Sequence, residues 1–163
     1  MKTFINARVL LPDGIIRRGY LTEDNGVIQA VGPMADGQSL PGDIIDCNGM
    51  YLSPGFIDLH SHGGGGYDYM DGGLEDIVGA ARMHLSHGAT SILPTTLTSS
   101  DEELFQVIDV FKEAQKMTDN MPHLLGLHLE GPYFSPAEKG AQDPRYITSP
   151  KPEHYKKIVE YAD

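Results

Sequence analysis

The feature that most constrains the fold is the alternation of strand-like and helix-like patterns after residue 54. Three short apolar runs have the composition of strands: 56–62, 90–97 and 124–130. Each is followed by a segment with apolar residues at helical spacing: 74–87, 100–111 and 152–163. Because crossover helices join parallel strands at this spacing, the chain is predicted to belong to the α/β class.

The first 53 residues have a different pattern, with short β-prone runs and no helical period. Pro12-Asp13-Gly14 predicts a turn between two strands. Asp24-Asn25-Gly26 predicts a tight hairpin, because Asn and Gly tolerate the positive φ angles of a type I′ turn. We therefore expect two domains, a small β module at 1–53 and an α/β domain at 54–163.

The helix boundaries of the second domain are also marked in the sequence. Gly88 is placed as a helix stop, and Ser100 as the N-cap of the next helix with Glu103 in the capping-box position. Three β/α units do not close a barrel, and the last helical pattern runs to Asp163 without a cap. The chain is therefore expected to be the N-terminal part of a longer protein, or one half of a split one.

Composition narrows the class of partner. The net charge of −11 argues against nucleic acid or an anionic membrane, although a small anionic substrate stays compatible. Cys47 is the only cysteine and is expected to be inert packing, so no intrachain disulfide forms and a reducing compartment is favoured. No run approaches the ~18 apolar residues of a membrane span. A cytoplasmic protein is expected.

A candidate metal site lies at the carboxyl end of the first strand of the α/β domain. Strict alternation places Asp58, His60 and His62 on one face, and the apolar Ile57 and Leu59 on the face toward the helices. Two imidazoles two residues apart on one strand converge on a common point, which suits a divalent metal. The alternative to a metal site is that His60 and His62 are two ordinary surface histidines at the entrance to a loop.

The third strand repeats this arrangement. Leu125, Leu127 and Leu129 share one predicted face, and His128 and Glu130 share the other. Glu130 falls at the carboxyl end, where side chains of neighbouring parallel strands meet, so it is predicted to join His60 and His62. The alternative is that Glu130 caps the following turn in solvent.

Other polar residues are weaker candidates. Asp58 and His128 lie one layer deeper. Asp58 could orient a ligand histidine or form a structural hydrogen bond, and His128 is expected to be a core histidine or to support a ligand, with a ligand role as the alternative. Gly63–Gly66 lacks the ending of a P-loop and is interpreted as a close backbone approach to a metal or substrate, or as a mobile loop. In the loop 139–146, Gln142 and the backbone amides are candidate substrate contacts, and the alternative is a solvated connector. The remaining histidines are expected to be solvated: His84, His87, His123 and His154.

The motifs together resemble a known family. "PGFIDLHSHG" after a small β module resembles the amidohydrolase superfamily. "HGATSILPTTLTS" and "GLHLEGPYFSPAEKGAQDP" are similar to the N-acetylglucosamine-6-phosphate deacetylases within it. The resemblance implies a (β/α)8 TIM-type barrel, of which residues 54–163 form the first three units, beside a small β-sandwich built from both ends of the chain. It also implies hydrolysis of N-acetylglucosamine 6-phosphate to glucosamine 6-phosphate and acetate.

The same resemblance assigns roles to individual residues. Glu130 matches a metal ligand, His60 and His62 match the ligands of a second metal position, and Ala141 and Gln142 fall where the family contacts the sugar. It implies one or two divalent ions per subunit, with zinc, iron and manganese all suited to the ligands, and a homodimeric complete enzyme. The general acid/base aspartate is expected beyond residue 163, so no catalytic residue is assigned here. We expect residues 1–163 alone to have negligible deacetylase activity.

Two other functions fit parts of the pattern. A dihydroorotase- or hydantoinase-like amidohydrolase would bridge its metals with a carboxylated lysine on the fourth strand, and the glutamate at position 130 argues against it. A non-catalytic amidohydrolase-like interaction protein would have no need of His60, His62 and Glu130. Metal content distinguishes that alternative from an enzyme.

Overall fold

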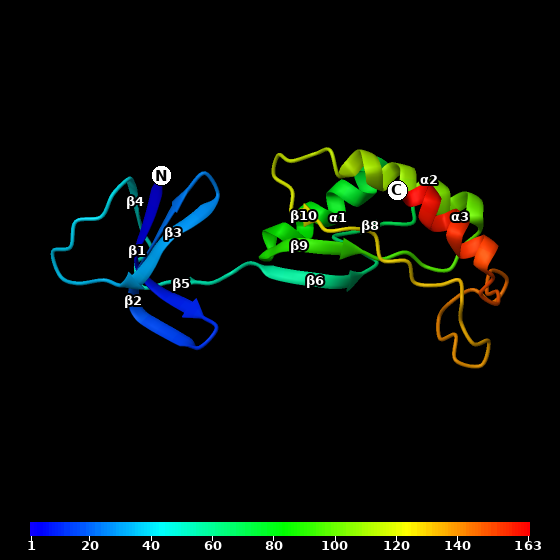
Figure 1. The fold of residues 1–163 in the computed structure, drawn as a ribbon, viewed down its shortest axis with the longest axis horizontal. Coiled ribbons are helices and arrows are strands. Elements are labelled where there is room, and N and C mark those ends of the chain that lie inside the picture. The colour runs from blue at the N-terminus through cyan, green and yellow to red at the C-terminus, as the bar shows by residue number, and fades with distance from the viewer. The chain divides into compact units, whose positions relative to one another are not determined.

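The computed structural model describes all 163 residues, and the chain divides into two compact units. Unit 1 comprises Met1–Pro54 and unit 2 comprises Gly55–Asp163. The predicted domain boundary, between residues 53 and 54, lies one residue from this division. Each unit has its own β-structure (Figure 1). Each also has its own buried apolar residues, so each is described by itself.

Unit 1 is a single five-stranded sheet with β1 at its centre. Its strands are β1 (Lys2–Leu11), β2 (Gly14–Asp24), β3 (Val27–Pro33), β4 (Asp43–Asp46) and β5 (Tyr51–Leu52). β1, β2 and β3 form an antiparallel meander, whereas β4 and β5 both pair parallel with β1. The predicted hairpin is present: Asn25 and Gly26 have φ angles of 51° and 79°. One sheet is present, so the predicted β-sandwich stays a prediction.

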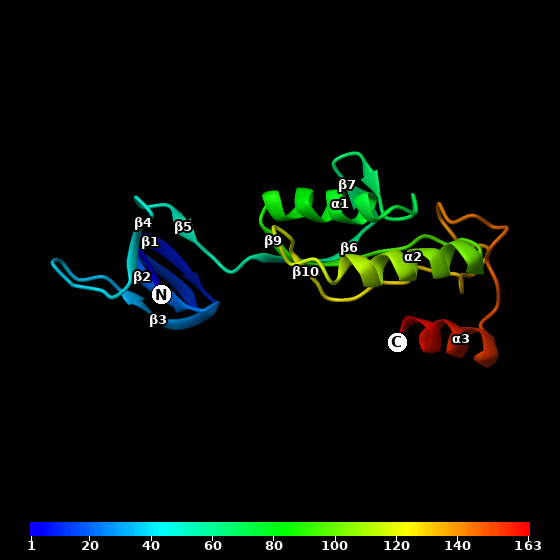
Figure 2. The same cartoon turned by 90° about the horizontal axis from the view of Figure 1, so that it is seen from above.

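Unit 2 contains a parallel three-stranded sheet of order β10-β9-β6. Its elements are β6 (Phe56–Ser61), β7 (Gly63–Gly64), β8 (Tyr67–Asp68), α1 (Leu74–Ser86), β9 (Ala89–Pro94), α2 (Asp101–Ala114), β10 (His123–Leu124) and α3 (Pro152–Ala162). Helices α1 and α2 lie over the same side of the sheet, and Figure 2 shows α2 between α1 and α3. The α/β class predicted from the sequence is confirmed.

The core of unit 2 is packed between the sheet and these two helices. Ile92 of β9 is fully buried among Ala80 and Ala81 of α1 and Phe111 of α2. A second cluster joins α2 to α3 through Leu104, Ile108 and Ile158. The small alanine side chains allow α1 to lie close to β9, which is the neighbour of β6 in the sheet. No helix of the structure is both long enough and apolar enough to span a membrane.

The ends of the helices follow local sequence signals. The Ser100 hydroxyl accepts a hydrogen bond from the Glu103 amide at 3.2 Å, and the Glu103 carboxylate accepts one from the Ser100 amide at 3.2 Å. This is the predicted capping box. Gly88 follows α1 with a φ of 95°, which suits its predicted role as the helix stop.

The third strand is shorter than predicted. Only His123–Leu124 forms regular strand β10, and pairing resumes as a single bridge between Thr95 and His128. Pro94 of β9 explains the interruption. Its carbonyl oxygen accepts a hydrogen bond from the His128 backbone amide at 2.8 Å. Its nitrogen faces the same segment but carries no proton, so the hydrogen bond that another residue would donate there is missing. The segment after β10 therefore follows β9 with an interrupted ladder.

The predicted faces of this segment are correct for its second half. Leu127 and Leu129 pack against the α2–α3 cluster, and His128 and Glu130 point the other way. Leu125, predicted on the face of the other two leucines, is 45% exposed. The amides of Leu125 and His128 bond to the carbonyls of Ile92 and Pro94, so an advance of three residues on this segment matches an advance of two on β9. The extra residue shifts the alternation of side chains.

A similar irregularity changes the faces of β6. Asp58 pairs with Ile92 and Ser61 pairs with Pro94, so β6 contains one residue more than β9 over this stretch. A bulge of this kind interrupts the period-two alternation of side chains. Asp58 therefore shares a face with Ser61, whose hydroxyl lies 3.4 Å from the hydroxyl of Tyr69, and not with His60 and His62.

The prediction for the apolar residues of β6 is consequently wrong. Asp58, not the apolar pair, faces α1, where its carboxylate lies 3.6 Å from His84 Nδ1. Ile57 and Leu59 are 64% and 58% exposed and contribute to no buried cluster. The face of the sheet that carries the histidines is therefore the uncovered one.

The glycine run is part of a paired element. It forms a short antiparallel hairpin in which Gly63 pairs with Asp68 and Gly64 pairs with Tyr67. A Cβ at Gly64 would lie 1.9 Å from the Met83 Cε on α1, so the backbone at Gly64 approaches that helix closely. An approach of the run to a metal or substrate stays a prediction. The hairpin packs onto α1 beside the end of β6.

Candidate metal centre

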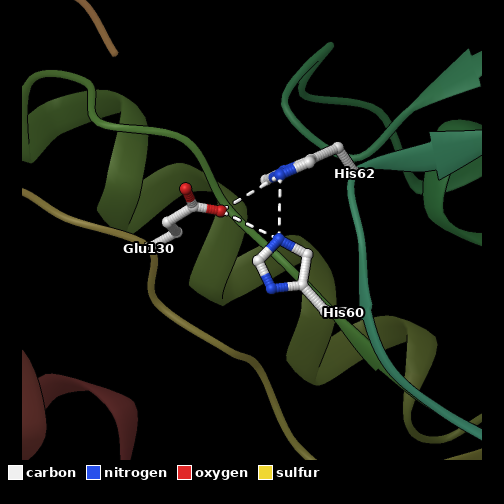
Figure 3. Close-up of side chains that lie close together, drawn as sticks. All are labelled: His60, His62 and Glu130. Carbon is white, nitrogen blue, oxygen red and sulfur yellow. Dashed lines mark hydrogen bonds and ion pairs between the residues drawn. The ribbon is translucent and has the colours of Figure 1, made fainter. Parts of the chain in front are cut away.

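Three potential metal ligands converge beyond the carboxyl end of β6. His60 and His62 come from the end of that strand, and Glu130 comes from the segment that follows β10 (Figure 3). Glu130 Oε2 lies 3.0 Å from His60 Nε2 and 3.1 Å from His62 Nε2, and the two Nε2 atoms are 3.2 Å apart. The predicted meeting of these side chains is therefore present, and the alternative of Glu130 in solvent is not.

This triangle of atoms fits a divalent cation. Two ligands about 2.1 Å from an ion and separated by 90–110° lie about 3.0–3.4 Å apart, and all three observed separations fall in that range. Glu130 Oε2 is also buried and accepts no hydrogen bond, although it lies close to both imidazoles. A buried carboxylate oxygen without a donor is costly unless a cation is present. The donor set of two imidazoles and one carboxylate suits zinc, iron or manganese.

The orientation of His62 follows from a backbone carbonyl. His62 Nδ1 lies 3.1 Å from the Thr95 oxygen, which can only accept a hydrogen bond. Nδ1 must therefore carry the proton in the neutral ring, and the lone pair of Nε2 faces Glu130 and His60. A hydrogen bond of this kind fixes both the tautomer and the ring plane of a metal-binding histidine.

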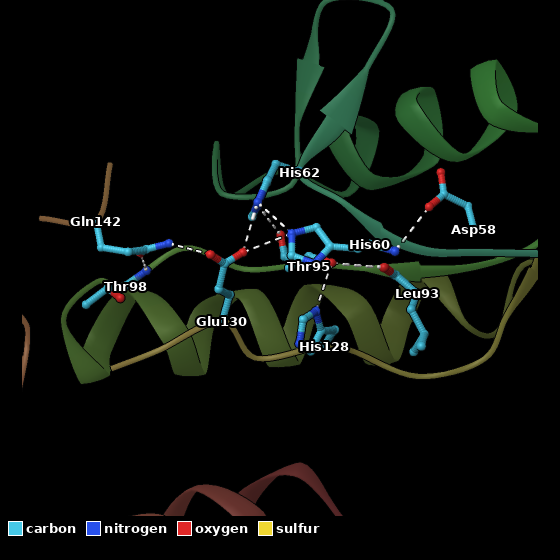
Figure 4. Close-up of polar contacts among 9 residues, drawn as sticks. All are labelled: Asp58, His60, His62, Leu93, Thr95, Thr98, His128, Glu130 and Gln142. Carbon is cyan, nitrogen blue, oxygen red and sulfur yellow. Dashed lines mark hydrogen bonds and ion pairs between the residues drawn. The ribbon is translucent and has the colours of Figure 1, made fainter. Parts of the chain in front are cut away.

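Asp58 and His128 surround the site without joining it (Figure 4). Asp58 accepts a hydrogen bond from the backbone amide of His60 at 3.1 Å, so it fixes the main chain of the ligand and not its ring. His128 lies 3.3 Å from the Thr95 hydroxyl through Nδ1, and its ring centroid is 5.1 Å from that of His60. Both residues are outside the cluster of three ligands.

Glu130 is held by a contact from the loop 139–146. The Gln142 side-chain amide donates to Glu130 Oε1 at 2.9 Å and accepts from the Thr98 backbone amide at 2.8 Å (Figure 4). Gln142 is only 5% exposed, whereas its neighbour Ala141 is exposed. Of the two residues predicted to contact substrate, Gln142 therefore lies beside the ligand cluster, bonded to one of its members.

Two histidines expected in solvent are instead engaged in contacts. His84 is 16% exposed, and its Nε2 lies 3.1 Å from the Gly63 carbonyl oxygen. His154 lies between the Tyr133 hydroxyl, at 2.8 Å from Nδ1, and Asp101, at 2.9 Å from Nε2. Their partners are distant in sequence, so the local pattern around each histidine carries no signal for the contact. His87 and His123 are exposed and Cys47 is buried, as predicted.

Comparison with known proteins decides the family. The model of the amidohydrolase family matches residues 51–163, which include all three candidate ligands. The chain belongs to the amidohydrolase family. The resemblance drawn from the "HLEGP" and "KGAQ" motifs is confirmed by individual relatives of this amidohydrolase.

Curated relatives extend the match across the chain. The N-acetylglucosamine-6-phosphate deacetylase of Caenorhabditis elegans is 31% identical over 98% of this chain and 39% of its own length. The deacetylase of Haemophilus influenzae is 32% identical over 98% of this chain and 41% of its own length. This amidohydrolase therefore spans about 40% of the length of the curated relatives it matches.

A solved structure supports the fold. The crystal structure of N-acetylglucosamine-6-phosphate deacetylase from Pasteurella multocida superposes with a TM-score of 0.81 at 32% identity. The alignment covers 99% of this amidohydrolase and 42% of the other chain. The arrangement of strands and helices described above is thus that of a deacetylase over the matched part.

Proposed function

We propose that this amidohydrolase contributes to the hydrolysis of N-acetylglucosamine 6-phosphate to glucosamine 6-phosphate and acetate. The observation that carries the proposal is the convergence of His60, His62 and Glu130 at the end of β6 in a chain whose relatives are named for that reaction. In this proposal residues 54–163 form three β/α units of a (β/α)8 barrel, and residues 1–53 form part of a β-sandwich. The enzyme is cytoplasmic and homodimeric.

The proposed cofactor is one or two divalent ions, held by His60, His62 and Glu130. When bound, the ion supplies Lewis-acid polarisation of the amide carbonyl and of water. The chain supplies the orientation: the Thr95 carbonyl fixes the His62 ring, and Asp58 fixes the backbone of His60. Glu130 adds negative charge that offsets the charge of the cation.

The remaining roles are assigned by resemblance. Ala141 and Gln142 are proposed to contact the sugar, and Gln142 is hydrogen-bonded to Glu130 of the ligand cluster. No residue of this chain is assigned the proton transfer to the leaving amine, and an aspartate outside residues 1–163 is proposed for it. Residues 1–163 alone are accordingly expected to release no measurable acetate.

The first prediction tests the reaction in a chimera, in which residues 1–163 replace the matching segment of the Haemophilus influenzae relative. We expect metal-dependent release of acetate from N-acetylglucosamine 6-phosphate. Glu130→Gln should lower kcat at least about 100-fold, because it removes the charge that faces the cation. His87→Ala, at an exposed histidine on the same domain, is the control and should leave the rate unchanged. A folded, metal-loaded chimera that releases no acetate, or whose rate is insensitive to Glu130→Gln, would contradict the proposal.

A further inference from the structure

Glu130 presents its two carboxylate oxygens to different neighbours. Oε2 faces the imidazoles of His60 and His62, and Oε1 accepts a hydrogen bond from Gln142 at 2.9 Å. The backbone around Glu130 is not held by a regular ladder, since β10 ends at Leu124 and the last bridge is at His128. The hydrogen bond to the Glu130 carboxylate comes from the side chain of Gln142, so this contact can set the direction of the carboxylate.

The geometry points to Gln142 as the residue that positions Glu130 for the metal, and we propose this role for it. Gln142 is 5% exposed, and both ends of its side-chain amide are engaged. The family resemblance implies that Gln142 contacts the sugar. The positioning role is an additional one, and it uses the amide oxygen and one N–H of the side chain. The inference rests on the proposed metal site.

The orientation of the Gln142 amide is determined by its other partner. The backbone N–H of Thr98 can only donate, and it lies 2.8 Å from Gln142 Oε1. The oxygen of the amide must therefore face Thr98, which forces the NH₂ group toward Glu130 Oε1. A rotated amide would place two donors against each other at Thr98 and two acceptors against each other at Glu130. Gln142 thus connects the carboxylate of Glu130, through two hydrogen bonds, to a buried backbone amide.

An uncharged donor is the appropriate group at this position. Lysine or arginine in place of Gln142 would offset the charge of Glu130 and repel a cation bound at Oε2. The amide instead supplies a directed hydrogen bond and leaves the full negative charge on the carboxylate. One N–H of the amide is used by Glu130, so the second remains for a substrate hydroxyl or for water.

The loop that carries Gln142 is itself braced. The backbone N–H of Gln142 donates to the backbone carbonyl of Lys139 at 3.1 Å. The Lys139 Nζ in turn donates to the backbone carbonyl of Gln142 at 3.1 Å. These bonds close the loop on itself behind the side chain. The hydrogen bond between Thr98 and Gln142 links the loop after β9 to the loop that follows β10.

The test is the affinity for Zn²⁺ of the 163-residue chain, measured by competition with a chromogenic chelator. Gln142→Leu keeps a similar volume and removes both hydrogen bonds, and loss of such a supporting contact should weaken Zn²⁺ binding about 10–100-fold. Gln115→Leu is the matched control, because that amide donates to the Leu124 carbonyl at the opposite end of the segment. Its affinity should equal that of the wild type.

A second variant keeps the test independent of folding. Gln142→Asn retains a polar amide in the buried site but is shorter by one methylene, so an amide bonded to Thr98 cannot reach Glu130. It should weaken Zn²⁺ binding like Gln142→Leu, while the melting temperature without metal stays close to that of the wild type. A folded variant of either kind that binds Zn²⁺ within twofold of the wild type would overturn the inference alone. A wild-type chain that binds no Zn²⁺ would overturn both the inference and the proposed metal site.

Discussion

At the scale of single residues, hydrogen bonds to the main chain set the direction of the candidate ligands. The Thr95 carbonyl selects the tautomer of His62, the Asp58 carboxylate holds the amide of His60, and Thr98 acts on Glu130 through Gln142. Main-chain groups move less than long side chains, so a site supported in this way is organised before any ion binds.

The contact between Asp143, next to Gln142, and Arg145 is expected to depend on pH. Hydrogen bonds from the Arg145 side chain, then from its backbone amide, lower the pKa of the Asp143 carboxyl from 3.8 to about 2. Because this pKa is lower in the folded state, the contact stabilises the loop above about pH 4 and is lost as the pH falls toward 2. An NMR titration of the Asp143 carboxyl should have its midpoint near 2, and Arg145→Gln should return it toward 3.8. A midpoint that Arg145→Gln does not move would show that the pair is absent in solution.

At the scale of elements, the capping box of α2 is the clearest local determinant. Ser100→Ala removes the acceptor of the Glu103 amide and should lower the free energy of unfolding by about 1 kcal/mol. Urea unfolding followed at 222 nm reports the loss, because all three helices belong to unit 2. Ser149→Ala, at an exposed serine outside the helices, serves as the comparison. Equal midpoints for the two variants would argue against the cap.

Local signals of this kind are what the sequence reveals best. The cap at Ser100, the stop at Gly88 and the turn at Asn25 depend on residues a few positions away, and all three are present in the structure. The convergence of His60 with Glu130 was also predictable, since the carboxyl ends of parallel strands share one edge.

Features that depend on a neighbouring strand were not predictable in the same way. The interruption of the third strand arises from Pro94, which is in β9 and not in the segment it affects. The bulge in β6 is a mismatch of register between two strands, so period-two alternation assigned Asp58, Ile57 and Leu59 to the wrong faces. His154 likewise contacts Asp101 only because α2 and α3 pack together.

At the scale of the whole molecule, the proposed metal joins segments that are far apart in sequence. His60 and His62 end β6, whereas Glu130 follows β10, and β9 lies between these strands in the sheet. An ion bound to all three side chains would oppose separation of the outer strands. Binding of the proposed ion would therefore be coupled to the folding of unit 2.

This coupling gives the last prediction. If Zn²⁺ binds only the folded chain, a free concentration about 100 times the dissociation constant adds about 2.7 kcal/mol to the free energy of unfolding. The melting temperature followed at 222 nm should therefore rise with Zn²⁺ and fall back when a chelator is added. The double variant His60→Ala/His62→Ala should lose the rise, whereas His87→Ala should keep it because that histidine is exposed and outside the cluster. An equal rise in the double variant would place the stabilising ion elsewhere on the chain, since Glu130 alone cannot replace the two imidazole ligands.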